Sequence, residues 1–125
     1  MGTQGKTKLV AIVDDDDLMR SALQGLLKTV GLSARTFASA EEFLSSGDQH
    51  QTACLIADIR MPGISGLDLQ AKLNAERCRI PTIFITARGD EKMRMQALRA
   101  GATEFLAKPF DDEVLLDSVR AALES

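Results

Sequence analysis

Five short apolar runs alternate with five amphipathic stretches along the chain. Each run predicts a buried β-strand, because charged, glycine or proline residues close it after only a few positions. The expected strands cover 9–13, about 34–37, 54–57, 82–85 and 103–107. The run at 54–57 ends in Asp58, and the turn residues Pro62 and Gly63 follow shortly after it. This carboxylate should therefore stand where a strand leaves its sheet.

The stretches between the runs repeat apolar residues at helical spacing and carry capping signals at their starts. The expected helices run over 18–30, from a Ser39 cap through 44, over 67–75, from an Asp90 cap through 99, and from an Asp111 or Asp112 cap through about 123. Asp16 or Asp17 should cap the first helix, and 46–51 should be a polar loop with a solvated His50. The last helix should bury one stripe, made of Val114, Leu115, Ser118, Val119, Ala122 and Leu123.

Strand and helix alternate five times, and every connection between strands is long enough for a crossover. This order predicts an α/β fold, in which five helices cover both faces of a five-stranded parallel sheet. Five such units favour the flavodoxin-like, doubly wound strand order 2-1-3-4-5. In sheets of this kind, ligands bind beyond the carboxyl ends of the strands, near the point where the strand order reverses.

The composition is that of one globular domain, with 125 residues of which 45% are hydrophobic and 26% charged. Residues 1–7 are expected to be a flexible N-terminus or expression remnant, and 8–125 a single domain. A formal net charge of −3 gives no sign of a nucleic-acid-binding surface. Two distant cysteines and one histidine argue against a zinc site or a disulfide framework. The sequence has no long apolar segment, which argues against membrane contact and favours the cytoplasm.

Charged and hydroxyl side chains end or follow four of the predicted strands. Asp14 and Asp15 follow the first, Asp58 the third, Thr86 the fourth and Lys108 the fifth. Because parallel strands end at one edge, these groups should converge there. Packed carboxylates repel one another, and an oxygen-only set suits Mg²⁺ better than zinc. A carboxylate beside such a cation can attack phosphorus and form an aspartyl phosphate, which the hydroxyl and the ammonium can contact.

Four segments also carry a family resemblance. They are Val13-Asp14-Asp15-Asp16, Asp58-Ile59-Arg60-Met61-Pro62-Gly63 with Gly66, Ile85-Thr86-Ala87, and Lys108-Pro109-Phe110. Together they are similar to the receiver domain of bacterial two-component response regulators, over nearly all of 8–124. The resemblance implies that Asp58 accepts a phosphoryl group from the phosphohistidine of a sensor histidine kinase. It implies Mg²⁺ (or Mn²⁺) bound by Asp15, Asp58 and the Arg60 backbone carbonyl, with Asp14 acting through water.

The resemblance further implies a phosphorylation-driven switch, in a signalling domain that catalyses its own phosphotransfer and slow autodephosphorylation but is not an enzyme. Thr86, Ala87 (through its backbone N–H) and Lys108 would contact the phosphoryl group, and the Lys108–Pro109 bond would be cis. Thr86 and Phe105 would shift together. The face that changes would include Met93, Arg94, Ala97, Leu98, Phe105 and Leu116. We expect this face to mediate phosphorylation-dependent homodimerisation; Met93 and Ala97 could instead be core, whereas Leu116 is the better surface candidate.

Two further expectations concern the rim of the site and the rest of the protein. Arg60 and Arg88 lie two residues after Asp58 and Thr86, where they could gate water and tune the lifetime of the phosphoryl group. The 60–67 segment most resembles receivers of helix-turn-helix transcriptional regulators. DNA would then be contacted only through a C-terminal output domain that this chain does not carry. We expect an excised regulatory domain rather than a stand-alone receiver, because the sequence stops where its last helix ends.

Two other functions remain open from the residues alone. A phosphohydrolase of the haloacid-dehalogenase type would use Asp14 as nucleophile and Asp16 as second carboxylate, but it would leave Asp58 unexplained. A pure interaction module would not need the acidic residues, the threonine and the lysine at one edge. Each of these residues also has an ordinary structural explanation on its own, and only their joint position favours phosphoryl chemistry.

Overall fold

The computed structural model describes residues 9–87 and 91–124. Its centre is one parallel sheet with the strand order β2-β1-β3-β4-β5, which confirms the predicted topology. The strands are β1 (Leu9–Val13), β2 (Ala34–Phe37), β3 (Thr52–Asp58), β4 (Thr82–Thr86) and β5 (Glu104–Ala107). β1, β3 and β4 are nearly continuous apolar runs because both of their faces are covered, as parallel sheets require.

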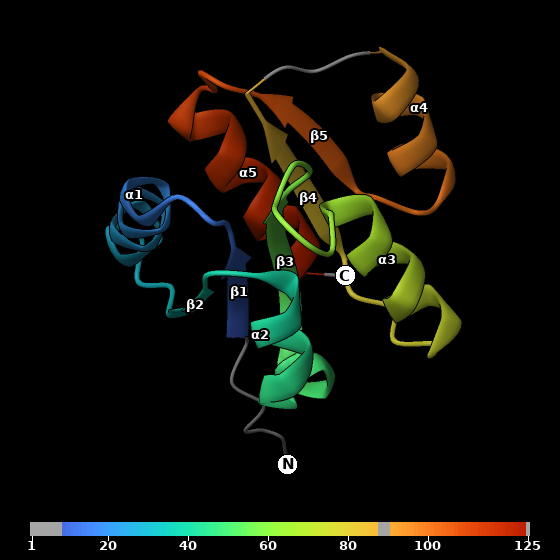
Figure 1. Cartoon of the computed structure of the whole chain (residues 1–125). Coiled ribbons are helices and arrows are strands. Elements are labelled where there is room, and N and C mark those ends of the chain that lie inside the picture. Colours follow the sequence, from blue (N-terminus) through green and yellow to red (C-terminus); the bar gives the residue numbers. More distant parts are fainter. Residues whose placement is uncertain (1–8, 88–90, 125) are drawn as a thin grey trace.

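Helices cover both faces of this sheet, as predicted (Figure 1). They are α1 (Asp17–Lys28), α2 (Ala40–Ser46), α3 (Gly66–Ala75), α4 (Glu91–Arg99) and α5 (Asp112–Leu123). The apolar side chains form two clusters, one on each side of the sheet. One cluster joins α1 and α5 to the sheet, and the other joins α2, α3 and α4 to its opposite face.

Short polar side chains cap the N-termini of α1, α2, α3 and α5. Asp16, one of the two expected candidates, caps α1 by accepting from the backbone N–H groups of residues 18 and 19. Ser39 caps α2 as predicted, and Asp111 rather than Asp112 caps α5. Ser65 caps α3 by accepting from the N–H of Asp68, a cap that was not among those predicted from the sequence. The predicted cap Asp90 lies outside the described residues.

The register of the parallel strands places their carboxyl ends side by side. Val13 pairs with Ala57, Asp58 with Ile85, and Thr86 with Ala107. Each of the strands β1, β3, β4 and β5 therefore finishes within about one residue of its neighbour in the sheet. The side chains that end or follow these strands must lie at one edge of the sheet, which is the arrangement that the sequence predicts.

The buried stripe of α5 differs from the prediction. Val114 is 45% exposed, whereas Leu116, expected at the surface, is only 7% exposed. The buried positions of this helix are Leu115, Leu116, Val119, Ala122 and Leu123. Each residue turns an α-helix by about 100°, so these positions share a face that points away from Val114. The predicted stripe was thus rotated too far toward Val114. Ser118, which was also predicted to belong to the stripe, is only partly buried.

The 46–51 segment is more ordered than the polar loop that we predicted. It contains a short 3₁₀-helix, η1 (Asp48–Gln51), which leads directly into β3. The buried Asp48 carboxylate pairs with Arg35 of β2 at 2.7 Å, and this ion pair anchors the segment. His50 is exposed, as expected. Within the described residues, no helix combines the length and the apolar character needed to cross a membrane.

Candidate functional site

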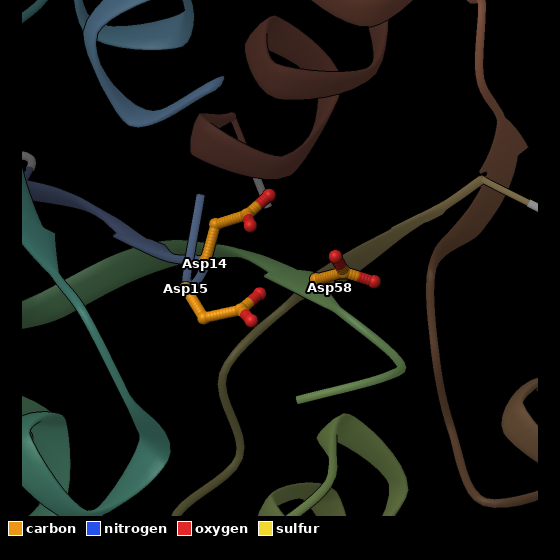
Figure 2. Close-up of side chains that lie close together, drawn as sticks. All are labelled: Asp14, Asp15 and Asp58. Carbon is orange, nitrogen blue, oxygen red and sulfur yellow. The ribbon is translucent and has the colours of Figure 1, made fainter. Parts of the chain in front are cut away.

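Three carboxylates meet at the carboxyl edge of the sheet. Asp14 and Asp15 follow β1, and Asp58 is the last residue of β3, the neighbouring strand. One oxygen of each lies within 4.8 Å of one oxygen of each of the others (Figure 2). Asp14 is 2% and Asp58 9% exposed, whereas Asp15 lies at the surface. The strand register alone is enough to bring these acidic side chains together.

Lys108 joins the acidic group from the end of β5. Its ammonium nitrogen lies 3.4 Å from Oδ2 of Asp58 and 3.6 Å from Oδ2 of Asp14. The Lys108 backbone N–H donates to the carbonyl of Thr86 at 2.8 Å, and the Lys108–Pro109 peptide bond is cis, as expected. One ammonium opposes three carboxylates, so the group keeps an excess of negative charge.

Backbone N–H groups fix the orientation of the two buried carboxylates. Oδ1 of Asp14 accepts from the N–H of Asp16 at 2.9 Å, and Oδ1 of Asp58 accepts from the N–H of Arg60 at 3.1 Å. The second oxygen of each carboxylate is then the one that faces Lys108. Burial raises the pKa of the Asp14 carboxyl above its usual value, and Asp58 and Asp15 add to this rise, while the Asp16 N–H and Lys108 oppose it.

The chemistry of this donor set fits Mg²⁺ or Mn²⁺. All of the grouped side-chain donors are carboxylate oxygens, which hard divalent cations prefer, and the described residues place neither histidine nor cysteine among them. A divalent cation would also offset the excess negative charge of a buried, crowded group. Asp15 remains exposed, so the group is open to solvent on one side.

Three further predicted site residues, Thr86, Ala87 and Arg60, lie at the same edge, whereas Phe105 lies two residues before the end of β5. Thr86 is fully buried at the end of β4, and Ala87 is exposed directly after it. Phe105 in β5 is half-buried. Arg60 is exposed, and its guanidinium lies 3.8 Å from the sulfur of Met93 in α4. Arg88 lies outside the described residues.

The sequence did not reveal two charged side chains that hold the loops of the site. The guanidinium of Arg20, in α1, donates to the backbone carbonyl of Asp14 at 2.6 Å and also pairs with Asp17. The carboxylate of Glu41, in α2, accepts from the backbone N–H of Ile64 at 3.3 Å. The sequence offers a signal only for the Arg20–Asp17 pair, whose spacing of three residues suits one helix turn.

A family model described as the response regulator receiver domain matches residues 10–120. The chain belongs to this family. The receiver domain is 47% identical over 123 residues to nodulation protein W of Bradyrhizobium diazoefficiens, covering 98% of this chain and 54% of that protein. It is 42% identical over 114 residues to the transcriptional regulatory protein FixJ of Azorhizobium caulinodans, covering 91% of this chain and 54% of that protein.

Solved structures support the same assignment. The structure of the response regulator StyR superposes on this receiver domain with a TM-score of 0.88 at 44% identity, covering 94% of this chain and 60% of that one. The receiver domain spans about half the length of the curated relatives named above. Its homologues include transcriptional regulators, as the sequence predicted.

The family assignment decides against the haloacid-dehalogenase alternative. The geometry agrees, because that mechanism needs Asp16 beside Asp14 as a second reacting carboxylate. The Asp16 side chain instead accepts from the N–H groups of Leu18 and Met19 and serves as the cap of α1. Asp58, which the alternative left unexplained, lies within the acidic group.

Proposed function

We propose that this receiver domain takes a phosphoryl group onto Asp58 from the phosphohistidine of a sensor histidine kinase. The observation that carries the proposal is the position of Asp58, buried beside two further carboxylates and 3.4 Å from the Lys108 ammonium. A carboxylate in this position is oriented by a backbone N–H and has a cation beside it to balance new negative charge. Positioning and charge compensation are most of what phosphoryl transfer requires.

In the proposed step, one carboxylate oxygen of Asp58 forms a bond to phosphorus. The bond between phosphorus and the histidine nitrogen of the kinase breaks, and that nitrogen keeps the electron pair. The ammonium of Lys108 stays beside the Asp58 carboxylate and compensates the charge of the phosphoryl oxygens. The hydroxyl of Thr86 and the N–H of Ala87, at the end of β4, hydrogen-bond the other phosphoryl oxygens.

Asp15, Asp58 and the Arg60 backbone carbonyl would hold Mg²⁺ or Mn²⁺ directly, and Asp14 would act through a bound water. When bound, the cation supplies charge neutralisation for the phosphoryl oxygens. The N–H of Arg60 already donates to Asp58, so the Arg60 peptide lies next to the acidic group. The Asp14 carboxylate adds to the negative charge that attracts the cation.

The proposed output is a change of the surface formed by α4, β5 and α5. In this proposal, Thr86 moves toward the phosphoryl group and Phe105 turns inward. The added phosphoryl charge thus shifts these two side chains from one arrangement to another. Ala97 and Leu116 are both buried. The residues of the predicted face that remain available for a dimer contact are Met93, Arg94, Leu98 and Phe105. The dimer would then control transcription through a C-terminal output domain, the only part to contact DNA, in the cytoplasm.

Mass measurement of the intact protein tests the phosphoacceptor. After incubation with a small phosphodonor and Mg²⁺, we expect one phosphoryl adduct that is absent from Asp58→Asn. Asp68→Asn is the matched control, because Asp68 is an exposed aspartate in the first turn of α3 and its substitution should leave the adduct intact. An adduct that persists in Asp58→Asn would contradict the proposal, as would repeated turnover that is lost in Asp14→Asn.

Light scattering tests the proposed dimer. With beryllofluoride as phosphoryl mimic and Mg²⁺ present, we expect the mass to rise from monomer to dimer at micromolar protein concentration. The receiver domain of DrrB, which is 26% identical to this one, has been solved in a BeF₃-activated form. A mass that does not change with the mimic would count against dimerisation while leaving the phosphoacceptor assignment untouched.

A further inference from the structure

Helix α2 reaches the loop that follows Asp58. Glu41 lies in the first turn of α2, which is fixed by the Ser39 cap and by the buried side chains of Ala40 and Phe43. From there its Oε2 accepts from the backbone N–H of Ile64 at 3.3 Å. The two residues are 23 positions apart in the sequence, so this contact ties the loop to a separate element of the fold.

Gly63 lies against the same carboxylate. Its φ is 77°, in the left-handed region that favours glycine, and a Cβ atom placed on it would run into the Glu41 carboxylate. The loop backbone therefore lies directly against Glu41 over two consecutive residues. A side chain at position 63 would strain the backbone and would push the Glu41 carboxylate away from the loop.

The rest of the loop is fixed at the sheet. At its start, the N–H of Arg60 donates to Oδ1 of Asp58 at 3.1 Å. At its end, the N–H of Gly66 donates to the carbonyl of Ile59 at 2.8 Å, and Gly66 packs against the Asp58 backbone. Between these points, Glu41 contacts the turn at Gly63 and Ile64.

We propose that Glu41 is a positioning residue for the metal site: by fixing the turn around Gly63, it holds the Arg60 peptide in the orientation that metal binding needs. This inference rests on the proposed role of the Arg60 carbonyl as a metal ligand. A loop that is already ordered loses little conformational entropy when the cation binds, whereas a loose loop must be ordered at that moment. Glu41 thus favours binding without touching the cation.

Glu42 offers a matched control for the charge of Glu41. Both glutamates are exposed in the first turn of α2, and replacing either by alanine removes one negative charge from the same turn. The Oε1 atom of Glu42, however, accepts from the backbone N–H of Ala38 rather than from the loop. A general electrostatic effect on Mg²⁺ would affect both variants alike, and a positioning effect only Glu41→Ala.

Isothermal titration with Mg²⁺ alone is the first test, since the chain has neither tryptophan nor tyrosine to report binding by fluorescence. We expect Glu41→Ala to weaken Mg²⁺ binding about fivefold, somewhat less than the loss typical for direct partners of metal ligands. Glu42→Ala should bind Mg²⁺ like the unmodified protein. Glu41→Gln keeps an amide oxygen that can accept from Ile64, so it should restore most of the affinity.

Amide hydrogen exchange in the metal-free protein is the second test. The Ile64 N–H should exchange faster in Glu41→Ala, while amides in the centre of β3 keep their protection; Glu42→Ala should not change the Ile64 rate. If the unmodified protein binds Mg²⁺ and Glu41→Ala changes neither the Mg²⁺ affinity nor the exchange of the Ile64 N–H, this inference alone is overturned. Unmodified protein that binds no Mg²⁺ would overturn the inference together with the proposed metal site.

Discussion

Two parts of the molecule meet at the site and differ in how firmly they are packed. The anchor half consists of β1, β3 and the loops that follow them. From Val10 to Val13 its first strand is fully buried, and Arg20, Glu41 and Gly66 hold its loops. The responsive half consists of β5 and α4. Three residues of β5 are only half-buried, and α4 has a single buried residue, Ala97.

This difference suits a switch that one added charge controls. The carboxylates lie on the anchor half, where a fixed geometry keeps phosphoryl transfer and cation binding efficient. Phe105 lies in β5, which is an edge strand of the sheet, and Lys108 directly follows that strand. Weakly packed elements open or shift at lower cost than buried ones, so a change at the site should spread toward β5 and α4 rather than toward β1.

The largest effect should come from Gly66→Ala in the anchor half. A Cβ atom there would collide with the carbonyl of Asp58 and crowd the Cα of Ile59. We expect a loss of about 3 kcal/mol in the free energy of unfolding, because a close-packed backbone cannot yield. Urea unfolding followed by circular dichroism measures it.

Gly25→Ala is the matched control for this change. Gly25 lies inside α1 with no atom near the place of an added Cβ, so alanine there should stabilise the protein by about 0.5–1 kcal/mol through helix propensity. Equal losses in the two variants would show that the anchor half is not specially rigid.

Asp14→Asn should have a smaller effect of opposite sign. Asp14 is a buried carboxylate crowded by Asp15 and Asp58, and burial raises its carboxyl pKa, so its charged form is held at a cost. Without metal at pH 7, asparagine should stabilise the fold by about 1 kcal/mol, because it removes repulsion at intermediate dielectric. With Mg²⁺ the order should reverse, since the variant binds the stabilising ligand more weakly. Thermal unfolding with and without Mg²⁺ compares the stability of Asp14→Asn with that of the unmodified protein.

The sequence predicted the strands and their shared edge in both halves. Strands such as β3 are apolar runs ended by charged or turn residues, so their identity, order and shared edge follow from local pattern and from the rules of parallel sheets. Asp14, Asp58 and Lys108 were placed correctly at that edge because each ends or directly follows a strand. The local sequence alone is enough to identify which residue ends a strand.

The sequence could not show how side chains reach across the fold. The contact of Glu41 with Ile64 joins segments 23 residues apart and depends on how α2 lies beside the loop. Val114 is exposed and Leu116 is buried because of how α5 is rotated about its own axis. Both residues are apolar, so the local sequence does not determine which of them faces the sheet. Such details follow from packing between elements, which periodicity within one element does not determine.

Phe105→Leu tests the responsive half. Because Phe105 is half-buried, leucine should cost no more than about 1 kcal/mol in the free energy of unfolding. Phosphorylation of Asp58 should proceed as before, but the rise in mass on addition of beryllofluoride should be lost in light scattering. Phe37→Leu is the matched control in β2: it breaks an edge-to-face contact with Phe43 in the core, so it should cost more stability and keep the rise in mass. The opposite pattern would contradict the division into two halves.

The smallest effect should be on the lifetime of the phosphoryl group, set at the rim where the two halves meet. Arg60 belongs to the anchor half, yet its guanidinium contacts the sulfur of Met93 in α4. Replacing both Arg60 and Arg88 by alanine should change the autodephosphorylation rate about threefold, because their side chains then no longer control how water reaches phosphorus; this equals a change of about 0.7 kcal/mol in the barrier.

The decay of the phosphorylated protein, followed by intact mass, measures this rate. Arg79→Ala with Arg99→Ala is the control of equal charge, since both of these exposed arginines line a cavity beside Pro81 and Gly101, near the opposite end of β4. A similar change of rate in both double variants would mean that net charge controls the decay. A change confined to the variant of Arg60 and Arg88 would place control of the lifetime at these two arginines rather than in the net charge.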